Sequence, residues 1–197
     1  MLSKFINSGL LVSILLIFMQ FFQKDLLFLR ENIQQGEIWR ILTGNLVHSN
    51  YYHLGLNLAG FWVFLLLFKE IMNSTQLLIN LMLLISGVGM GLYIFNPELY
   101  WYAGLSGALY GLFIIGAFYA VIDKDYLTAS SIIIVIPSKI IWDHIHNTGQ
   151  SNAELIGVPV STDAHIYGIM IGVIIGIFYL LQTLLPKTQR NSRWHKK

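Results

Sequence analysis

Four long stretches of the chain contain no Asp, Glu, Lys or Arg. They are Phe5–Gln23, Ile71–Phe95, Leu99–Ile122 and Ala164–Pro186. About 20 apolar helical residues cross the core of a bilayer, so each stretch is long enough to span one. Only 11% of the 197 residues are charged, against about a quarter in a soluble domain. The sequence therefore predicts an all-α, polytopic membrane protein and excludes a soluble enzyme, a nucleic-acid binder and a disordered regulator.

Two further apolar segments raise the predicted number of spans to six. One has His53 and Asn57 near its start, and the other has Pro137 and Lys139 near its end. The first apolar segment lacks a small-x-small cleavage site, so we expect it to be retained as a span. We expect one domain over residues 1–197, with spans at about 5–23, 50–68, 73–95, 103–122, 126–142 and 164–185.

The distribution of positive charge predicts the orientation. With six spans, both termini lie on the same side as the second and fourth connections. That side carries eight of the 12 basic residues, namely Lys4, Lys69, Lys124, Lys187, Arg190, Arg193, Lys196 and Lys197. By the positive-inside rule, both termini are expected on the cytoplasmic side.

The first outer connection, Asp25–Leu46, mixes apolar and charged residues along its length. An amphipathic stretch of this kind is typical of a segment that lies in the membrane interface. A role in contacting substrate and a role as a cap over the bundle are equally open.

Five polar residues stand out inside the predicted spans. They are His53, Asn57, Ser106, Tyr110 and His165. Polar groups within a membrane are costly, and they are therefore candidates for function. They occur near the outer ends of spans two, four and six, which run in the same direction. We therefore expect three helices to bring polar groups to a similar depth below the outer surface.

Small residues recur at four-residue spacing in spans four and six. They are Gly107, Gly111, Gly168, Gly172 and Gly176. Such spacing allows the backbones of two membrane helices to approach closely. Close packing of these spans would bring Ser106 toward His165. The alternative is that the glycines serve packing alone and that the serine bonds to its own helix.

A serine and a histidine at this depth suit nucleophilic catalysis. A serine hydroxyl needs a general base to take its proton, and a neutral histidine can serve. The predicted spans contain no carboxylate near this depth, so we expect a Ser106–His165 dyad rather than a triad. The ring of Tyr110 is a candidate for orienting His165.

Acyl transfer also requires donors for the developing oxyanion. Ser106 follows Ala103-Gly104-Leu105 at a predicted helix start, where backbone N–H groups lack intrahelical partners. His53 and Asn57 are candidates to add side-chain donors. The alternative for these two residues is a purely structural role in hydrogen bonds between helices.

Other membrane chemistries lack their residues. There is no HExxH zinc motif, no pair of aspartates in the predicted spans and no cysteine. Ligation of a metal by histidines would leave the serine and glycine pattern unexplained. A transporter would show mid-membrane carboxylates or a repeat, and we find no clear repeat.

Three motifs resemble the signatures of the rhomboid intramembrane serine proteases. His53-Leu-Gly-Leu-Asn57 resembles HxxxN, Gly104-Leu-Ser106-Gly107-Ala-Leu-Tyr110-Gly111 resembles GxSGxxxG, and Ala164-His165-Ile-Tyr-Gly168-Ile-Met-Ile-Gly172 resembles AHxxGxxxG. Trp39-Arg40 resembles the WR pair of the first loop in that family, although anchoring in the interface explains these two residues equally well.

The resemblance implies that Ser106 is the nucleophile and His165 the base. His53, Asn57 and the Ser106 N–H would assist the oxyanion, and Tyr110 would stack on His165. It further implies a serine endopeptidase of the bacterial inner membrane, with its site open to the outer face. The partners expected are a transmembrane protein substrate and lipid, without nucleic acid, metal or cofactor.

Rival classes are a non-catalytic rhomboid-like binder of membrane-protein clients, a structural bundle and a small-molecule transporter. A binder would tolerate Ser106→Ala in its cellular role, and a transporter would retain flux after that change. The oligomeric state stays open.

The residues around Trp39-Arg40-Ile-Leu-Thr-Gly44-Asn-Leu-Val-His48 and His53–Gly60 also resemble one bacterial branch, the rhombosortases. Substrates of that branch carry a C-terminal sorting tail with a Gly-Gly pair before a membrane helix and a basic end. The resemblance implies the same kind of substrate here.

Pro137 indicates where a substrate could enter. It removes one helix hydrogen bond from span five, and Ser138 and Lys139 weaken that end in lipid. We expect span five and the connection Asp143–Asp163 to move aside for a substrate helix. A static kink is the alternative.

Overall fold

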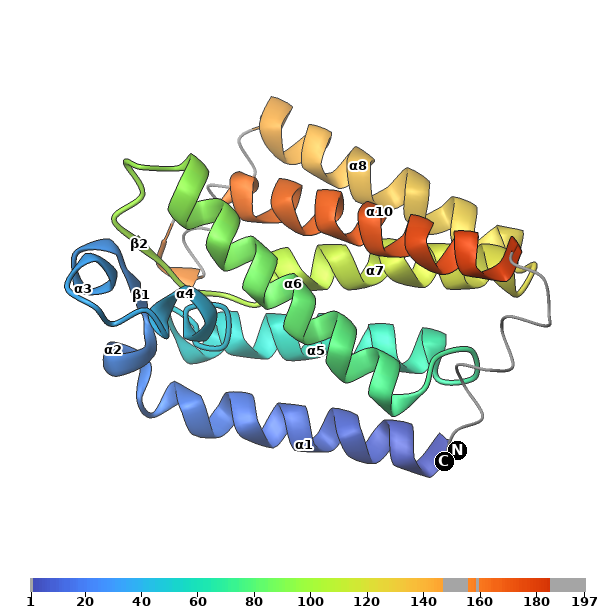
Figure 1. Ribbon diagram of the computed structural model, residues 1–197, viewed down its shortest axis with the longest axis horizontal. Helices are drawn as coiled ribbons and strands as arrows, with labels where there is room; N and C mark the ends of the chain where they lie inside the picture. Colours follow the sequence, from blue (N-terminus) through green and yellow to red (C-terminus); the bar gives the residue numbers. More distant parts are fainter. Residues whose placement is uncertain (1, 147–155, 159, 185–197) are drawn as a thin grey trace.

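The computed structural model describes residues 2–146, 156–158 and 160–184. Within these residues, six long helices lie side by side along the long axis of the molecule (Figure 1). Their bounds are α1 Leu2–Gln20, α5 Tyr51–Phe68, α6 Ser74–Phe95, α7 Ser106–Ile122, α8 Tyr126–His146 and α10 Thr162–Leu184. Residue 185 of the last predicted span and the basic tail Lys187–Lys197 lie outside the described residues.

Three of these helices, α5, α6 and α10, are long and apolar enough to cross a membrane by length and composition. The other three contain shorter apolar stretches, at Lys4–Gln20, Ser106–Ile122 and Tyr126–Lys139. The chain is therefore a mostly helical protein with the apolar helices of a membrane protein, and the number of six spans stays a prediction.

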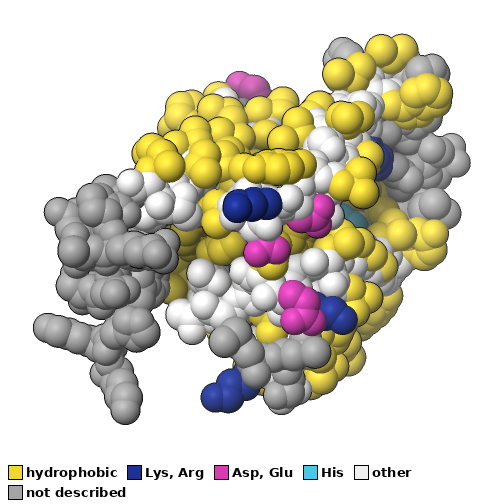
Figure 2. Space-filling model, turned by 90° about the vertical axis from the view of Figure 1, so that its right-hand side faces the viewer, with side chains coloured by type: hydrophobic (Ala, Val, Ile, Leu, Met, Phe, Trp, Pro, Cys, Tyr) yellow, Lys and Arg dark blue, Asp and Glu magenta, His cyan; other side chains and the backbone are white. Residues whose placement is uncertain are grey.

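Polar and apolar surface are segregated along the bundle. Large hydrophobic side chains are exposed along the sides of the long helices. Figure 2 looks onto the end where α5 joins α6 and α7 joins α8, and Lys, Asp and Glu side chains gather there among hydrophobic ones. These joining turns contain Lys69, Glu70 and Asp123–Asp125. This is the arrangement expected when the sides face lipid and the ends face water.

The start of α7 and the end of α8 differ from the sequence prediction. Helix α7 begins at Ser106 rather than at residue 103, because Gly104 has a φ of +137°, which a right-handed helix does not allow. Helix α8 runs through Pro137, as the predicted span 126–142 does, but ends at His146, four residues past the predicted end. The prediction ended the span at the first charged residue, Asp143, and a charged residue ends an apolar stretch without ending a helix. Residues 143–146 thus belong to α8 and not to the last connection, of which 147–155 and 159 lie outside the described residues.

Helix α1 ends at Gln20, three residues before the predicted end of the first span. A turn at Phe21 and Phe22 then leads into the short helix α2. The first connection therefore starts earlier than the sequence suggested.

Helices α7 and α10 make the closest contact in the bundle. A Cβ added to Gly168 would overlap the carbonyl oxygen of Gly107, and one on Gly172 would lie 2.6 Å from the carbonyl oxygen of Gly111. A Cβ on Gly107 would lie 2.7 Å from the carbonyl oxygen of Ala164. Only residues without a side chain allow this backbone-to-backbone approach.

The first outer connection folds into short elements at the end of the bundle where α5, α7 and α10 begin (Figure 1). They are α2 Gln23–Leu26, β1 Phe28–Leu29, α3 Arg30–Gln34 and α4 Arg40–Thr43. Strand β1 pairs antiparallel with β2, Trp101–Tyr102, which lies shortly before Ser106. Phe28 and Ile33 are buried in this segment, whereas Ile38 and Trp39 are exposed. The segment thus packs on the bundle along one side only.

Two arginines hold this connection in shape. Arg40 is 5% exposed. It pairs with Glu37 and donates to the carbonyl oxygens of Lys24 at 3.0 Å and Leu27 at 2.8 Å. Its hydrogen bond lowers the pKa of Glu37 below the ordinary value. Arg40 therefore satisfies backbone carbonyls of the connection, and Trp39 lies exposed beside it.

The second arginine, Arg30, caps the end of α6. It donates to the carbonyl oxygens of Leu92 and Tyr93 at 3.1 Å and of Asn96 and Leu99 at 2.9 Å. The last carbonyls of a helix have no intrahelical partners, so one guanidinium satisfies several of them.

The α7–α10 contact predicts a large difference between two Gly→Ala substitutions. Gly168→Ala is expected to lower the free energy of unfolding by about 1–3 kcal/mol, because the backbones must separate. Gly55→Ala is the matched control: it is also in a helix, and its added Cβ would meet nothing within 4 Å. Thermal unfolding in detergent measures both. Equal stability of the two variants would contradict this account of the contact.

Candidate active site

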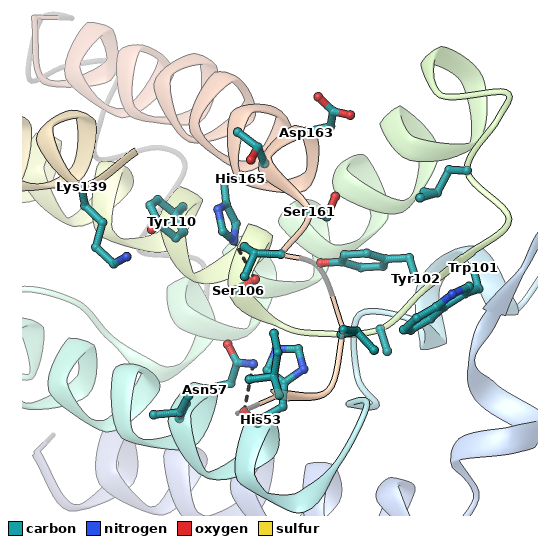
Figure 3. A pocket seen from close by; sticks show the side chains of 17 residues that line it. His53, Asn57, Trp101, Tyr102, Ser106, Tyr110, Lys139, Ser161, Asp163 and His165 are labelled. Atoms are coloured by element: carbon teal, nitrogen blue, oxygen red, sulfur yellow. Dashed lines mark hydrogen bonds between the residues drawn. The ribbon is translucent and has the colours of Figure 1, made fainter. Parts of the chain in front are cut away.

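The structure brings Ser106 and His165 together. Ser106 is the first residue of α7, and His165 lies in the first turn of α10. Ser106 Oγ lies 2.9 Å from His165 Nε2, within hydrogen-bonding distance. The two side chains point toward one another across the α7–α10 contact (Figure 3). The close packing of the α7 and α10 glycines therefore keeps Ser106 Oγ and His165 Nε2 within hydrogen-bonding distance.

The ring of Tyr110 stacks on His165. Their ring centroids are 4.2 Å apart and the planes differ by 20°. Tyr110 lies one turn after Ser106 on α7, so one helix supplies both the hydroxyl and the stacking ring. His165 is 6% exposed. Its imidazole is thus held by a hydrogen bond at one edge and by an aromatic face.

His53 lies in the first turn of α5, on the other side of the loop that precedes Ser106. It is 8% exposed, and its Nδ1 lies 3.0 Å from Ser49 Oγ. A Cβ on Gly104 would lie 2.8 Å from His53 Cε1. Two features therefore require glycine at position 104. Its φ of +137° disfavours other residues, and the His53 imidazole leaves no room for a Cβ.

Asn57 follows His53 by one helical turn and is 5% exposed. Its Nδ2 donates to the carbonyl oxygen of His53 at 3.2 Å. That bond uses one of the two amide hydrogens. Asn57 keeps a second donor hydrogen, on the same face as His53.

All five predicted polar residues line one cavity of about 700 Å³ (Figure 3). Helices α5, α7, α8 and α10 contribute to its wall, as do β2 and the residues that precede α10. The other lining residues are Leu56, Leu99, Trp101, Tyr102, Ala103, Lys139, Ile156, Val158, Val160, Ser161, Thr162 and Asp163. The dyad therefore faces a space large enough for several residues of a peptide.

Sequence reasoning missed Ser49, Tyr102 and Ile156. Ser49 bonds to both His53 and the carbonyl oxygen of Ile156, and its position four residues before His53 was the available signal. The Tyr102 hydroxyl donates to the carbonyl oxygen of Gly104 at 2.7 Å and steadies the loop before Ser106. No local pattern marks Ile156, because its contact depends on the folding of distant segments.

His48, which precedes α5, packs edge-on against His53 with ring centroids 5.1 Å apart. Burial, with a smaller contribution from His53, lowers the pKa of His48 to about 3. His48 is therefore neutral at physiological pH. Among residues 2–146, 156–158 and 160–184 no group of three His, Asp or Glu side chains is arranged to hold a metal ion.

Comparison with known proteins shows the family of the chain. The family model of the rhomboid domain matches residues 35–182, a range that includes every candidate residue. The chain therefore belongs to the rhomboid family, whose members include serine proteases that act within membranes.

One relative is a Bacillus subtilis (strain 168) protein named "Putative rhomboid protease YdcA". It is 25% identical over 133 residues, which cover 64% of this chain and 65% of that protein. The chain thus spans a little under two thirds of the length of this curated relative.

The stacking of Tyr110 predicts an effect on the reactivity of Ser106. Tyr110→Leu is expected to slow labelling of Ser106 by a fluorophosphonate about two- to tenfold, because an aromatic pair contributes about 0.5–1.5 kcal/mol. Tyr110→Phe retains the ring and serves as the matched control. Labelling rates of purified protein in detergent provide the measurement, and equal loss in both variants would argue against stacking as the cause.

Proposed function

We propose that this protein is an intramembrane serine endopeptidase that cleaves a membrane-anchored protein near the outer end of its transmembrane helix. The observation that carries the proposal is the 2.9 Å contact between Ser106 Oγ and His165 Nε2 at the wall of a 700 Å³ cavity. Membership of the rhomboid family supports it.

Attack begins with a proton transfer. Ser106 Oγ bonds to the carbonyl carbon of the scissile peptide while its proton passes to His165 Nε2. For this, His165 must be neutral with its proton on Nδ1, so that Nε2 can accept. The stacked ring of Tyr110 holds the imidazole in that orientation.

The resulting oxyanion requires hydrogen-bond donors. Ser106 is the first residue of α7, where backbone N–H groups are free of intrahelical bonds and the helix dipole favours negative charge. Asn57, which has a second amide hydrogen, and His53 line the same cavity. Removal of one such donor typically reduces the rate by about 10²–10³.

The intermediate collapses when His165 gives its proton to the leaving nitrogen and the peptide C–N bond breaks. Water then attacks the ester on Ser106, and His165 again accepts and returns a proton. These steps use side chains of the chain and water alone.

We assign the protein to the bacterial inner membrane, with both termini in the cytoplasm and the dyad near the outer face. The charge distribution supports the orientation. We further propose a substrate with a Gly-Gly pair before its membrane helix and a basic C-terminal end, because the residues around Trp39–His48 resemble the rhombosortase branch.

Substitution of the dyad tests the proposal. Ser106→Ala and His165→Ala are expected to reduce cleavage of a reporter with a Gly-Gly tail by on the order of 10⁴-fold or more. Ser86→Ala is the matched control, since Ser86 is half-buried on α6 and, among the described residues, its hydroxyl donates only to the carbonyl oxygen of Met82 in its own helix. Cleavage is followed in proteoliposomes, and a reporter with Ala-Ala in place of Gly-Gly tests the substrate branch.

Undiminished cleavage by Ser106→Ala would overturn the proposal. A protein that only binds clients would retain its cellular role in the same variant. Equal cleavage of both reporters would leave the protease in place and remove the Gly-Gly preference.

Substrate entry between α5 and α8 predicts inhibition by cross-linking. Leu56 on α5 and Lys139 on α8 both line the cavity, and the chain has no cysteine of its own. Leu56→Cys combined with Lys139→Cys, joined by a bifunctional maleimide, is expected to block cleavage of a membrane-anchored reporter. Each single variant treated with the same reagent is the control, and cleavage by the cross-linked protein would contradict entry at this place.

A further inference from the structure

The hydroxyl of Ser49 lies between two groups that compete for its single proton. Ser49 Oγ is 2.6 Å from the carbonyl oxygen of Ile156 and 3.0 Å from His53 Nδ1. A carbonyl oxygen can only accept a hydrogen bond, whereas an imidazole nitrogen can donate or accept. The shorter contact therefore requires that the Ser49 proton point at Ile156.

This assignment determines the tautomer of His53. With its own proton committed to Ile156, Ser49 Oγ can only accept from His53, so Nδ1 must carry the ring proton. A neutral imidazole has one N–H, and a charged one is costly at a site that is 8% exposed. His53 Nε2, the ring nitrogen on the side of Gly104, is then an acceptor.

An acceptor cannot stabilise an oxyanion. His53 lines the cavity beside Ser106, yet in this arrangement its Nε2 has no hydrogen to donate. The donor function requires the other tautomer, with the proton on Nε2. That tautomer is stabilised when the Ser49 hydroxyl turns and donates to Nδ1, which requires that the Ile156 carbonyl release it.

Ile156 stands where a substrate would displace it. Ile156 and Val158 line the cavity, and Ile156 is 5% exposed. A Cβ on Gly157 would lie 3.6 Å from Asn50 Nδ2, so Ile156–Val158 rests on the start of α5. A peptide bound in the cavity next to Ser106 therefore competes with the side chains of Ile156 and Val158 for the same space.

We propose that Ser49 is a positioning residue that couples substrate entry to the oxyanion site by setting the tautomer of His53. With Ile156 in place, Ser49 donates to its carbonyl oxygen and His53 is protonated at Nδ1. When substrate displaces Ile156, Ser49 donates to Nδ1. One proton then leaves Nδ1 to water while Nε2 takes one from water, with no net change in charge. This inference rests on the function proposed above.

The ring nitrogens of ¹⁵N-labelled histidine report the tautomer directly. In the resting protein the His53 signals, identified by their loss in His53→Asn, are expected to show a proton on Nδ1. After Ser106 reacts with a tetrapeptide boronic acid, which imitates the tetrahedral intermediate, the proton is expected on Nε2. A resting proton on Nε2, or one that stays on Nδ1 in the adduct, would overturn the coupling.

Kinetics of Ser49 variants give a second readout that does not require the spectrum. Ser49→Ala is expected to lower kcat about fivefold, as loss of one neutral hydrogen bond does, with KM little changed. Ser49→Thr keeps the hydroxyl and is expected to retain kcat. Ser161→Ala removes another cavity hydroxyl, which accepts from the Ala164 N–H and makes no hydrogen bond to His53 or Ser49 within the described part of the chain, so it is expected to leave the His53 tautomer unchanged. Equal kcat values for Ser49→Ala and wild type would refute the role of Ser49.

Different experimental results would contradict this inference and the proposed function. If a fluorophosphonate labels Ser106 while resting His53 is protonated at Nε2, the coupling is wrong and the protease stands. If accessible, folded protein shows no labelling of Ser106 and no cleavage, the protease is wrong and the coupling falls with it.

Discussion

The site depends on the backbone-to-backbone contact of α7 with α10. Gly168 lies against the carbonyl of Gly107, and Gly172 lies against that of Gly111. The Ser106 hydroxyl and the His165 imidazole, carried by separate helices, are thereby held 2.9 Å apart. In lipid there is little hydrophobic force between apolar helices, so such contacts rest on close van der Waals packing. A methyl group between the helices would move the dyad as well as weaken the bundle.

The elements that follow from local pattern could be read from the sequence. The six apolar segments correspond to six long helices in the described residues, and the four-residue spacing in Gly107–Gly111 and Gly168–Gly172 predicted which helix faces meet. The start of α7 was placed too early because the positive φ of Gly104 was not used. The end of α8 was placed at 142, where the apolar stretch meets Asp143, although the helix continues to His146. The contact of Ser49 with Ile156 joins residues 107 apart, and no local pattern encodes it.

The first outer connection acts on the site through the chain that leads into α7. Strand β1 pairs with β2, and the Tyr102 hydroxyl at the end of β2 bonds to the carbonyl of Gly104. Arg30 joins the same connection to the end of α6, and Arg40 satisfies carbonyls within it. Contacts from the first outer connection, outside the helical bundle, therefore stabilise the loop before Ser106. This gives the Trp39-Arg40 region a structural role that the sequence alone left open between anchoring and function.

Ser106 and His165 are separated by 59 residues, and the two halves of the dyad arrive in the membrane at different times during synthesis. When α7 has been inserted, Ser106 is present, but the His165 imidazole reaches it only after α10 follows and packs on α7. If the proposed dyad is correct, the Ser106 hydroxyl of a partly made chain is therefore unreactive. On the proposed chemistry, proteolytic activity appears only when α10, the last described helix, has packed on α7. A chain in which α10 is absent or misplaced therefore cannot cleave a substrate.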